Sequence, residues 1–139
     1  MKNTPLSKIM TRKLITVSPG QSMHDVNDLF EKNHLHHVPV VEKGKIVGII
    51  SLLDFMRISL GFRLGFEEEK EVNENILNNL KITEVMTEHP ICMSPDNTVK
   101  DAASLFCANM FHALPICEND KLVGIVTSTD VIAFLAGIK

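Results

Sequence analysis

Residues 48–54 read GIISLLD, and residues 124–130 read GIVTSTD. Both stretches follow one pattern: a glycine, two aliphatic residues, a hydroxyl residue, two variable residues and an aspartate. The aliphatic part predicts a strand. The hydroxyl-x-x-Asp part is typical of a helix start, where the two side chains cap backbone N–H groups. This strand-to-helix transition occurs twice in the chain, so the same local structure is expected at both places.

The whole chain repeats around this motif with an offset of 76 residues. Met10 recurs as Met86, and the register holds without a gap from residue 9 to the end of the chain. Self-similarity of this extent indicates two copies of one structural unit. The sequence therefore predicts a first repeat over 1–63, a connecting helix over 64–80 and a second repeat over 81–139.

Each repeat is predicted to run strand, helix, strand, strand, helix. In the first repeat these elements fall at a strand over 15–17, a helix capped by Ser22 and Asp25, strands over 37–41 and 46–50 joined by a turn over 42–45, and a helix over 52–60 stopped by Gly61. In the second repeat they include a helix capped by Thr98 and Asp101, a turn over 118–121, a strand over 122–126, and a helix over 131–136 stopped by Gly137. The fold class is α/β, with two pseudo-twofold-related repeats that each carry a small mixed sheet. Because one repeat alone buries little apolar surface, we expect the two to pack together.

Composition excludes several classes of function. The 139 residues have a net charge of −3, and Lys and Arg do not gather on one face, so we expect no nucleic-acid partner. No apolar run reaches the roughly 20 residues of a membrane span. Three cysteines without a CxxC pair, and no secretory leader, predict a cytoplasmic protein with reduced thiols. The cluster of His34, His36 and His37 lacks ligand spacing to a cysteine or carboxylate, so we expect no metal.

The repeated motif also suits a nucleotide. A hydroxyl and the first N–H groups of a helix can hold a phosphate, and an aspartate accepts hydrogen bonds from a pair of ribose hydroxyls. The glycine removes bulk where a ligand or another backbone comes close. Ser-x-x-Asp is also an ordinary capping box, and the two interpretations are compatible because a capped helix start can face a ligand.

Four motifs, in order and twice, resemble the tandem cystathionine-β-synthase (CBS) domain pair, or Bateman module. They are Ile9-Met10-Thr11 and Val85-Met86-Thr87, the Ser-Pro that follows each, His-x-x-Pro, and Gly-x-x-[Ser/Thr]-x-x-Asp. The resemblance covers nearly the whole chain except the connecting helix, so we expect a stand-alone pair with no attached catalytic domain. It implies regulatory binding of an adenosine ligand such as AMP, ADP or ATP, or in some members NAD or S-adenosylmethionine.

The resemblance also implies which residues bind. Asp54 and Asp130 would be ribose ligands, with Ser51 and Thr127 near phosphate. The adenine would lie in aliphatic slots formed by Thr16, Val17, Val38 and Pro39, and by Cys92, Met93, Leu114 and Pro115. His36 and His112 lie three residues before the prolines, as in the kinase-regulating γ subunits of this family, where a similar placement contacts phosphate; the alternative is a partly buried edge histidine.

The two repeats differ at the phosphate end. Arg57 lies one helical turn after Asp54, where it either reaches a phosphate or is a solvated helix residue, and Ala133 takes its place in the second repeat. Polar Ser128 and Thr129 replace two leucines. We therefore expect the first cleft to favour more highly phosphorylated nucleotides.

The sequence supports a function in regulation instead of catalysis. We expect an energy- or metabolite-sensing module that acts on an unidentified partner and forms a homodimer through its helices. The alternative is a protein-interaction and dimerisation module whose clefts are vestigial. No nucleophile with a paired base, carboxylate dyad or metal triad is recognisable, so we expect no enzyme activity.

Overall fold

The computed structural model describes residues 3–60 and 77–138, which form two compact units. One unit is Ile15–His89, and the other combines Met1–Leu14 with Pro90–Lys139. Each unit joins an antiparallel strand pair to helices, which confirms the α/β class. The units do not follow the sequence repeats at their ends, because the first 14 residues belong with the bulk of the second repeat.

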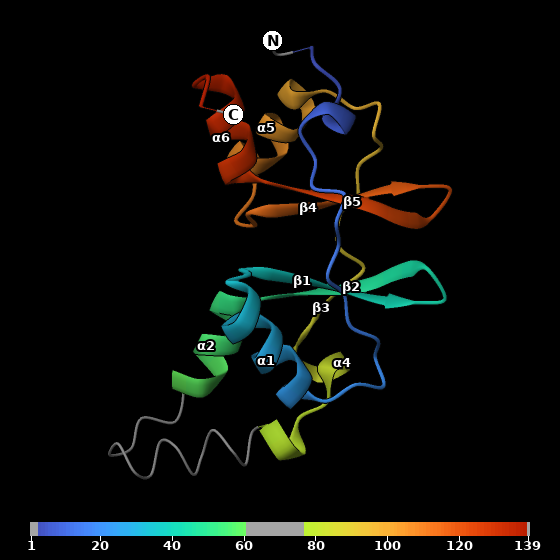
Figure 1. Cartoon of the computed structure of the whole chain (residues 1–139), viewed down its shortest axis with the longest axis vertical. Coiled ribbons are helices and arrows are strands. Elements are labelled where there is room, and N and C mark those ends of the chain that lie inside the picture. Colours follow the sequence, from blue (N-terminus) through green and yellow to red (C-terminus); the bar gives the residue numbers. More distant parts are fainter. Residues whose placement is uncertain (1–2, 61–76, 139) are drawn as a thin grey trace. The chain divides into compact units, whose positions relative to one another are not determined.

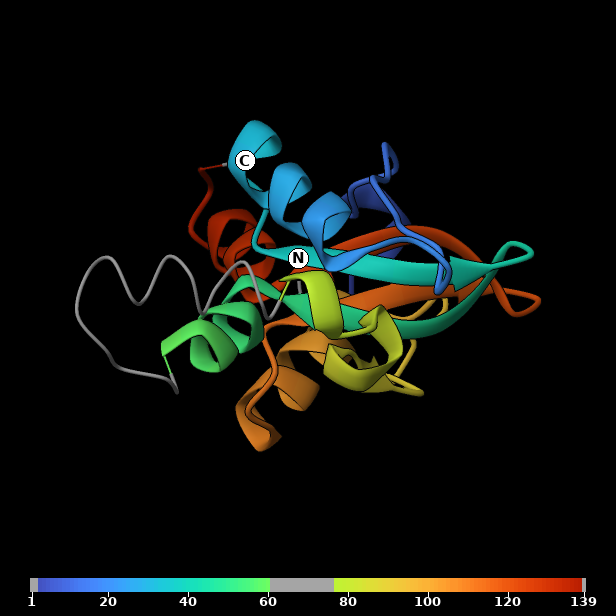
Figure 2. The same cartoon turned by 90° about the horizontal axis from the view of Figure 1, so that it is seen from below.

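The unit Ile15–His89 is built around one hairpin. Its elements are α1 (Met23–Asn33), β1 (His37–Glu42), β2 (Lys45–Ser51), α2 (Leu52–Leu60), α4 (Ile82–Val85) and β3 (Thr87–Glu88). Strand β2 pairs antiparallel with both β1 and β3. Helices α1 and α2 cover the same face of the hairpin, and its turn lies at the end away from α2 (Figures 1 and 2). The second predicted helix of the repeat, over 52–60, is confirmed by α2.

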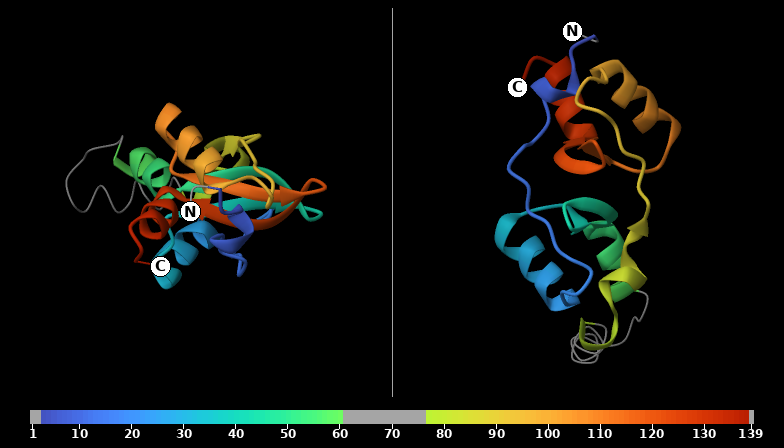
Figure 3. Two further views of the ribbon diagram at one scale, coloured as in Figure 1. Left: turned by 90° about the horizontal axis from the view of Figure 1, so that it is seen from above. Right: turned by 90° about the vertical axis from the view of Figure 1, so that its right-hand side faces the viewer.

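The other unit has the same plan. Its elements are η1 (Leu6–Lys8), α5 (Val99–Ala108), β4 (Ala113–Glu118), β5 (Lys121–Thr127) and α6 (Ser128–Leu135). Helices α5 and α6 lie on one face of the β4–β5 hairpin (Figure 3). Helix α6 begins three residues earlier than predicted, because Thr127 caps it, and Gly137 follows it with a φ of 75°.

Both hairpins turn over two residues with positive φ. These are Lys43 (54°) and Gly44 (81°) in the first, and Asn119 (53°) and Asp120 (68°) in the second. Two consecutive left-handed residues characterise the type I′ turn, whose twist matches that of paired strands. The predicted hairpin turns are confirmed, and they fix the register that places Ser51 and Thr127 at the ends of their strands.

The predicted strand over 15–17 is wrong. Only Val17 pairs, in an isolated parallel bridge to Val40, with its N–H donating to the Pro39 carbonyl at 3.0 Å. Met93 repeats this arrangement against Ile116. The turn that follows at Pro19 leaves too few residues for a ladder, because proline has no N–H to donate.

Helices α1 and α5 begin in complete capping boxes. The Asp25 N–H donates to Ser22 Oγ at 3.2 Å, and the Ser22 N–H donates to the Asp25 carboxylate at 3.1 Å. Thr98 and Asp101 repeat this pair at α5. Backbone hydrogen bonds from Ser22 and from Thr98 hold the pKa of the Asp25 and Asp101 carboxyls below the ordinary value of 3.8. Both predicted caps are confirmed.

The start of each repeat packs on the hairpin of the other repeat. Met86 lies against Gly48, and Met10 lies against Gly124. Thr11 exchanges backbone hydrogen bonds with Ile125 at 2.9 and 3.1 Å, as β3 does with β2. Each unit is therefore completed by a segment that sequence similarity assigns to the opposite repeat.

Each unit has its own apolar core. In one, Val17, Met23, Val26, Phe30, Val38, Val40, Ile50, Leu77 and Ile82 are buried together. In the other, the buried set is Leu6, Ile9, Met10, Met93, Val99, Ala102, Leu114, Ile116, Val126 and Val131. Each core includes residues of the exchanged segment, which ties that segment to the hairpin.

Most of the predicted connecting helix over 64–80, and the predicted stop at Gly61, lie outside the described residues. Residues 77–79 are helical, and Leu77 is buried in the core beside Ile82. The boundaries 1–63, 64–80 and 81–139 stay a prediction. Among the described helices, none has both the length and the apolar character needed to cross a membrane.

Candidate functional site

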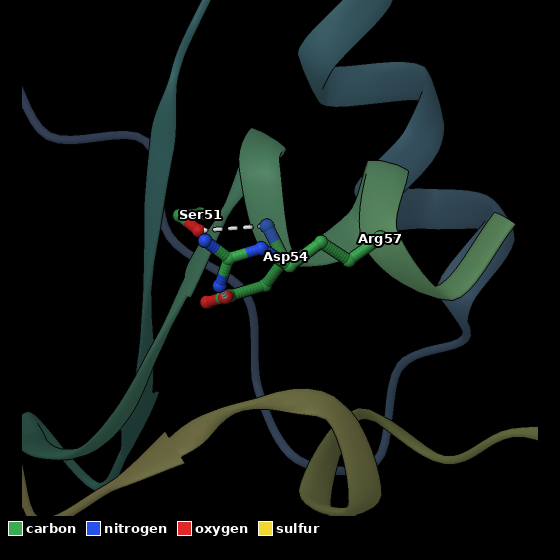
Figure 4. A network of polar contacts seen from close by, with 3 residues as sticks. All are labelled: Ser51, Asp54 and Arg57. Atoms are coloured by element: carbon green, nitrogen blue, oxygen red, sulfur yellow. Dashed lines mark hydrogen bonds and ion pairs between the residues drawn. The ribbon is translucent and has the colours of Figure 1, made fainter. Parts of the chain in front are cut away.

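The first candidate site is the start of α2, where β2 ends. Ser51 is the last residue of β2, and the Asp54 N–H donates to its Oγ at 2.9 Å. The Asp54 carboxylate forms an ion pair with Arg57, with 3.7 Å between Oδ1 and a guanidinium nitrogen. Figure 4 shows the Arg57 side chain directed back toward the start of α2. Three polar groups therefore meet at one helix end.

The start of α6 is the equivalent place in the other unit. Thr127 and Asp130 form a full capping box, with the Asp130 N–H donating to Thr127 Oγ1 at 3.1 Å and the Thr127 N–H donating to Asp130 Oδ2 at 2.9 Å. Both aspartates are half-buried. A hydroxyl side chain therefore caps both helix starts, and at α6 the carboxylate caps as well. Both carboxylates lie at solvent-accessible helix ends.

The glycine that recurs in both repeats lies against other protein atoms in each unit. A Cβ at Gly48 would overlap the sulfur of Met86, and one at Gly124 would meet the sulfur of Met10 at 2.6 Å. The sequence left open whether a ligand or another backbone comes close at these glycines. The structure shows that a neighbouring segment of the chain does.

Each predicted set of binding residues lies within a single unit. Ile15–His89 contains Thr16, Val17, His36, Val38, Pro39, Ser51, Asp54 and Arg57, and the other unit contains Cys92, Met93, His112, Leu114, Pro115, Thr127 and Asp130. The apolar members are largely core residues, since Val38 and Leu114 have 0% exposure. Thr16 and Cys92 are exposed at the edge of these slots. The Pro39 and Pro115 carbonyls accept hydrogen bonds from Val17 and Met93, so backbone hydrogen bonds hold each slot together.

The two predicted phosphate-side histidines have exposed side chains and ordered backbones. The His36 carbonyl accepts a hydrogen bond from the Leu52 N–H at 2.8 Å, and the His112 carbonyl accepts one from the Ser128 N–H at 2.9 Å. Both rings are exposed instead of partly buried at an edge. Each histidine therefore joins the start of its strand to the start of the following helix.

The histidine cluster has no common strand. His34 ends α1 in a left-handed conformation (φ 53°), and β1 begins only at His37. Within the described ranges, no group of three or more His, Cys, Asp or Glu side chains is placed to hold a metal ion.

Sequence reasoning overlooked Cys117. Burial raises the pKa of the Cys117 thiol to about 12, and a hydrogen bond with the Cys92 thiol acts in the same direction. All three cysteines are free, and Cys92 and Cys107 are exposed. The signal was available, because Cys117 follows the Leu114-Pro115 pair of the predicted slot by two residues.

The chain thus has two small α/β units, and in each a hairpin with a two-residue turn leads into a helix that starts at a hydroxyl-x-x-Asp motif. This arrangement is that of a tandem-repeat domain protein. The family model of the CBS domain matches residues 6–61 and 82–137. The chain belongs to the CBS domain family.

This chain matches different shares of its relatives' lengths. The uncharacterized protein MJ1426 of Methanocaldococcus jannaschii is 35% identical over 94% of this chain and 90% of its own length. MJ1225 of the same organism is 30% identical over 97% of this chain, which spans only 48% of that relative.

Solved CBS pairs share the fold. The CBS domain pair of protein MJ0100, in complex with 5′-methylthioadenosine and S-adenosyl-L-methionine, is 25% identical with a TM-score of 0.78, and the match covers 98% of both chains. CBSX2, a CBS-pair protein from Arabidopsis thaliana, is 24% identical. In its complex with AMP it has a TM-score of 0.78 over 97% of this chain and 98% of its own.

Proposed function

We propose that the chain is a regulatory module that binds an adenosine-containing ligand and reports energy or metabolite state to a partner protein. The observation that carries the proposal is the recurrence of a hydroxyl-x-x-Asp helix start, with a half-buried carboxylate, at the same place in both units. The ligands of MJ0100 and CBSX2 support the chemical class, because AMP, methylthioadenosine and S-adenosylmethionine share an adenosine moiety. AMP, ADP and ATP are the ligands we expect first, with NAD and S-adenosylmethionine as further candidates.

Asp54 and Asp130 would accept hydrogen bonds from the two ribose hydroxyls. A carboxylate only accepts, and its two oxygens match a pair of hydroxyl donors. Both aspartates are anchored through their own N–H group by the preceding hydroxyl side chain. These hydrogen bonds hold the backbone of each aspartate in place before a ligand binds, which lowers the entropy cost of ordering the site.

The adenine would lie beside the backbone of the paired segments. Val17 and Val38, and likewise Met93 and Leu114, place their side chains in the cores. The base would then contact backbone atoms and the exposed edge residues Thr16 or Cys92. The absence of Trp and Tyr from the sequence agrees with a base held without stacking on a large aromatic ring.

Asparagine variants separate ribose binding from helix capping. Asp130→Asn keeps a side-chain oxygen that can accept from the Thr127 N–H, but it removes one of the two ribose acceptors. Asp101→Asn is the matched control, because Asp101 caps α5 with the same geometry and lies outside the candidate site.

Calorimetric titration of the full chain with AMP, ATP and S-adenosylmethionine would test the proposal. We expect one class of site to be lost in Asp130→Asn, another in Asp54→Asn, and neither in Asp101→Asn. Equal binding by all three variants and the parent would show that these carboxylates are capping groups only. That result would favour the alternative of an interaction module with vestigial clefts.

We further propose a homodimer formed through the helices. Leu53 and Met56 on α2 have 52% and 45% exposure, and Ile132 and Leu135 on α6 have 65% and 47%. Exposed apolar side chains that adjoin one another mark contact surfaces, and each of these pairs is three residues apart on one helix. Sedimentation equilibrium at micromolar concentration should give twice the 15.5 kDa chain mass. Only monomer would contradict this, whereas Met56→Glu with Ile132→Glu should dissociate a dimer.

The regulated activity would reside in the partner, since the sequence carries no recognisable catalytic constellation. The three free thiols support a reducing compartment, the cytoplasm.

A further inference from the structure

The two aspartates differ in what holds their carboxylates. Asp130 Oδ2 accepts a hydrogen bond from the Thr127 N–H at 2.9 Å, and residue 133, one turn later, is alanine. Asp54 Oδ1 lies 3.7 Å from the Arg57 guanidinium, which is 70% exposed. One carboxylate is thus held by a backbone donor, and the other faces a movable cation.

Two backbone donors at each helix start are used in the same way. At α2, the Leu52 N–H donates to the His36 carbonyl and the Asp54 N–H donates to Ser51 Oγ. At α6, the Ser128 N–H donates to the His112 carbonyl and the Asp130 N–H donates to Thr127 Oγ1. These two amide groups therefore do not distinguish the sites, whereas the Arg57 guanidinium has an alanine, Ala133, in its place in the second repeat.

The Arg57–Asp54 pair is weak enough to exchange. Its two charges are 3.7 Å apart and the guanidinium is mostly in water, where ion pairs contribute little. The phosphate of AMP carries a charge of about −1.5 to −2 at pH 7 and three acceptor oxygens, against the single charge of Asp54, so it is the stronger, bidentate partner for a guanidinium. Figure 4 shows the arginine already directed toward the helix start instead of away from it.

We propose that Arg57 is the specificity-determining residue of the first cleft, where it leaves Asp54 for a ligand phosphate and so selects anionic adenosine ligands. This inference rests on the proposed function. A phosphorylated ligand gains the guanidinium while its ribose gains the released carboxylate. A neutral nucleoside takes the carboxylate but leaves the guanidinium with no anion. In the second cleft Ala133 takes the position of Arg57, so that cleft lacks this particular selection.

The test compares AMP with adenosine, which differ only in the phosphate. Calorimetry in the Asp130→Asn background isolates the first cleft, and Arg57→Ala is then added. We expect the AMP affinity to fall about tenfold to a hundredfold, the range of a lost charge-assisted bond. The adenosine affinity should not fall, because adenosine offers the guanidinium no anion and no longer has to displace it from Asp54. The dependence of AMP affinity on salt should also weaken.

The reverse exchange uses the other repeat. Ala133→Arg in the Asp54→Asn background should raise the preference of the second cleft for AMP over adenosine. If both compounds bind but the AMP-to-adenosine ratio is unchanged by Arg57→Ala, the role of Arg57 is wrong and the proposed function stands. If neither compound binds the parent chain, both are wrong.

Discussion

Replacing Gly48 by alanine should destabilise the unit Ile15–His89 by about 1–3 kcal/mol, the usual cost of overpacking. The new Cβ would overlap the Met86 sulfur, lie 2.8 Å from Met86 Cγ and lie 3.1 Å from the Thr87 carbonyl oxygen. The methionine can rotate, but Thr87 is paired with Ile49 in the β2–β3 ladder. Relief of the backbone contact therefore requires β3 to move away from β2.

Thermal and urea unfolding of the full chain, followed by circular dichroism, would measure this loss. For a unit of this size, each kcal/mol lowers Tm by roughly 4–8 °C. Gly20→Ala is the matched control, because no atom lies within 4 Å of its added Cβ and its φ is not in the left-handed region. We expect the control to be neutral or to stabilise by up to about 1 kcal/mol.

A double-mutant cycle with Met86→Ala would assign the cause. If overlap with Met86 is the main cost, the Gly48→Ala change should cost at least 1 kcal/mol less in the Met86→Ala background, since contacting residues are not additive. The reasoning is refuted if Gly48→Ala is as stable as Gly20→Ala, or if the two losses simply add.

Thr98→Ala removes the hydroxyl cap of α5 and should cost about 1 kcal/mol in urea unfolding. The pKa of Asp101 is lower in the folded chain than its ordinary value of 3.8, so the ionised carboxylate stabilises the fold fully above pH 3.8 and loses this effect as the pH falls through the folded pKa. Below pH 4 the urea midpoint should therefore decrease more in the parent than in Asp101→Asn. The Cys117 thiol has a pKa of about 12 and so carries little reactive thiolate at pH 8, where it should react with iodoacetamide far more slowly than the exposed Cys92 and Cys107. Peptide mass spectrometry would measure the three rates, and equal rates would contradict the burial of Cys117.

Local structure was readable from the sequence where short-range chemistry decides it. The hairpin turns follow from Lys43-Gly44 and its counterpart, and the helix starts follow from the hydroxyl-x-x-Asp spacing. The strand expected at residues 15–17 was wrong because a β-branched run alone does not supply a partner over its full length. Only Val17 reaches β1 before the chain turns.

The exchange of end segments was not predictable from the repeat. Met10 and Met86 are equivalent by the offset of 76, and so are Gly48 and Gly124. Either methionine fits either glycine by residue type, so the pattern does not say which copy a segment packs against. The candidate site was predictable as a set of residues, but the ion pair between Arg57 and Asp54 and the contact of Cys117 with Cys92 depend on side-chain directions that spacing alone does not give.

The exchanged segments also impose an order on synthesis. The unit Ile15–His89 is continuous in the chain and can fold on the ribosome as soon as β3 has emerged, since domains fold as units from the N-terminal end. The helix Leu6–Lys8 is made before the unit Ile15–His89, but it has no hairpin to pack on until β4 and β5 are made. Until then Leu6 of this helix, and Ile9 and Met10 after it, lack the core in which they are buried. The nascent chain therefore carries an unpaired arm ahead of the unit Ile15–His89 until the second hairpin is made.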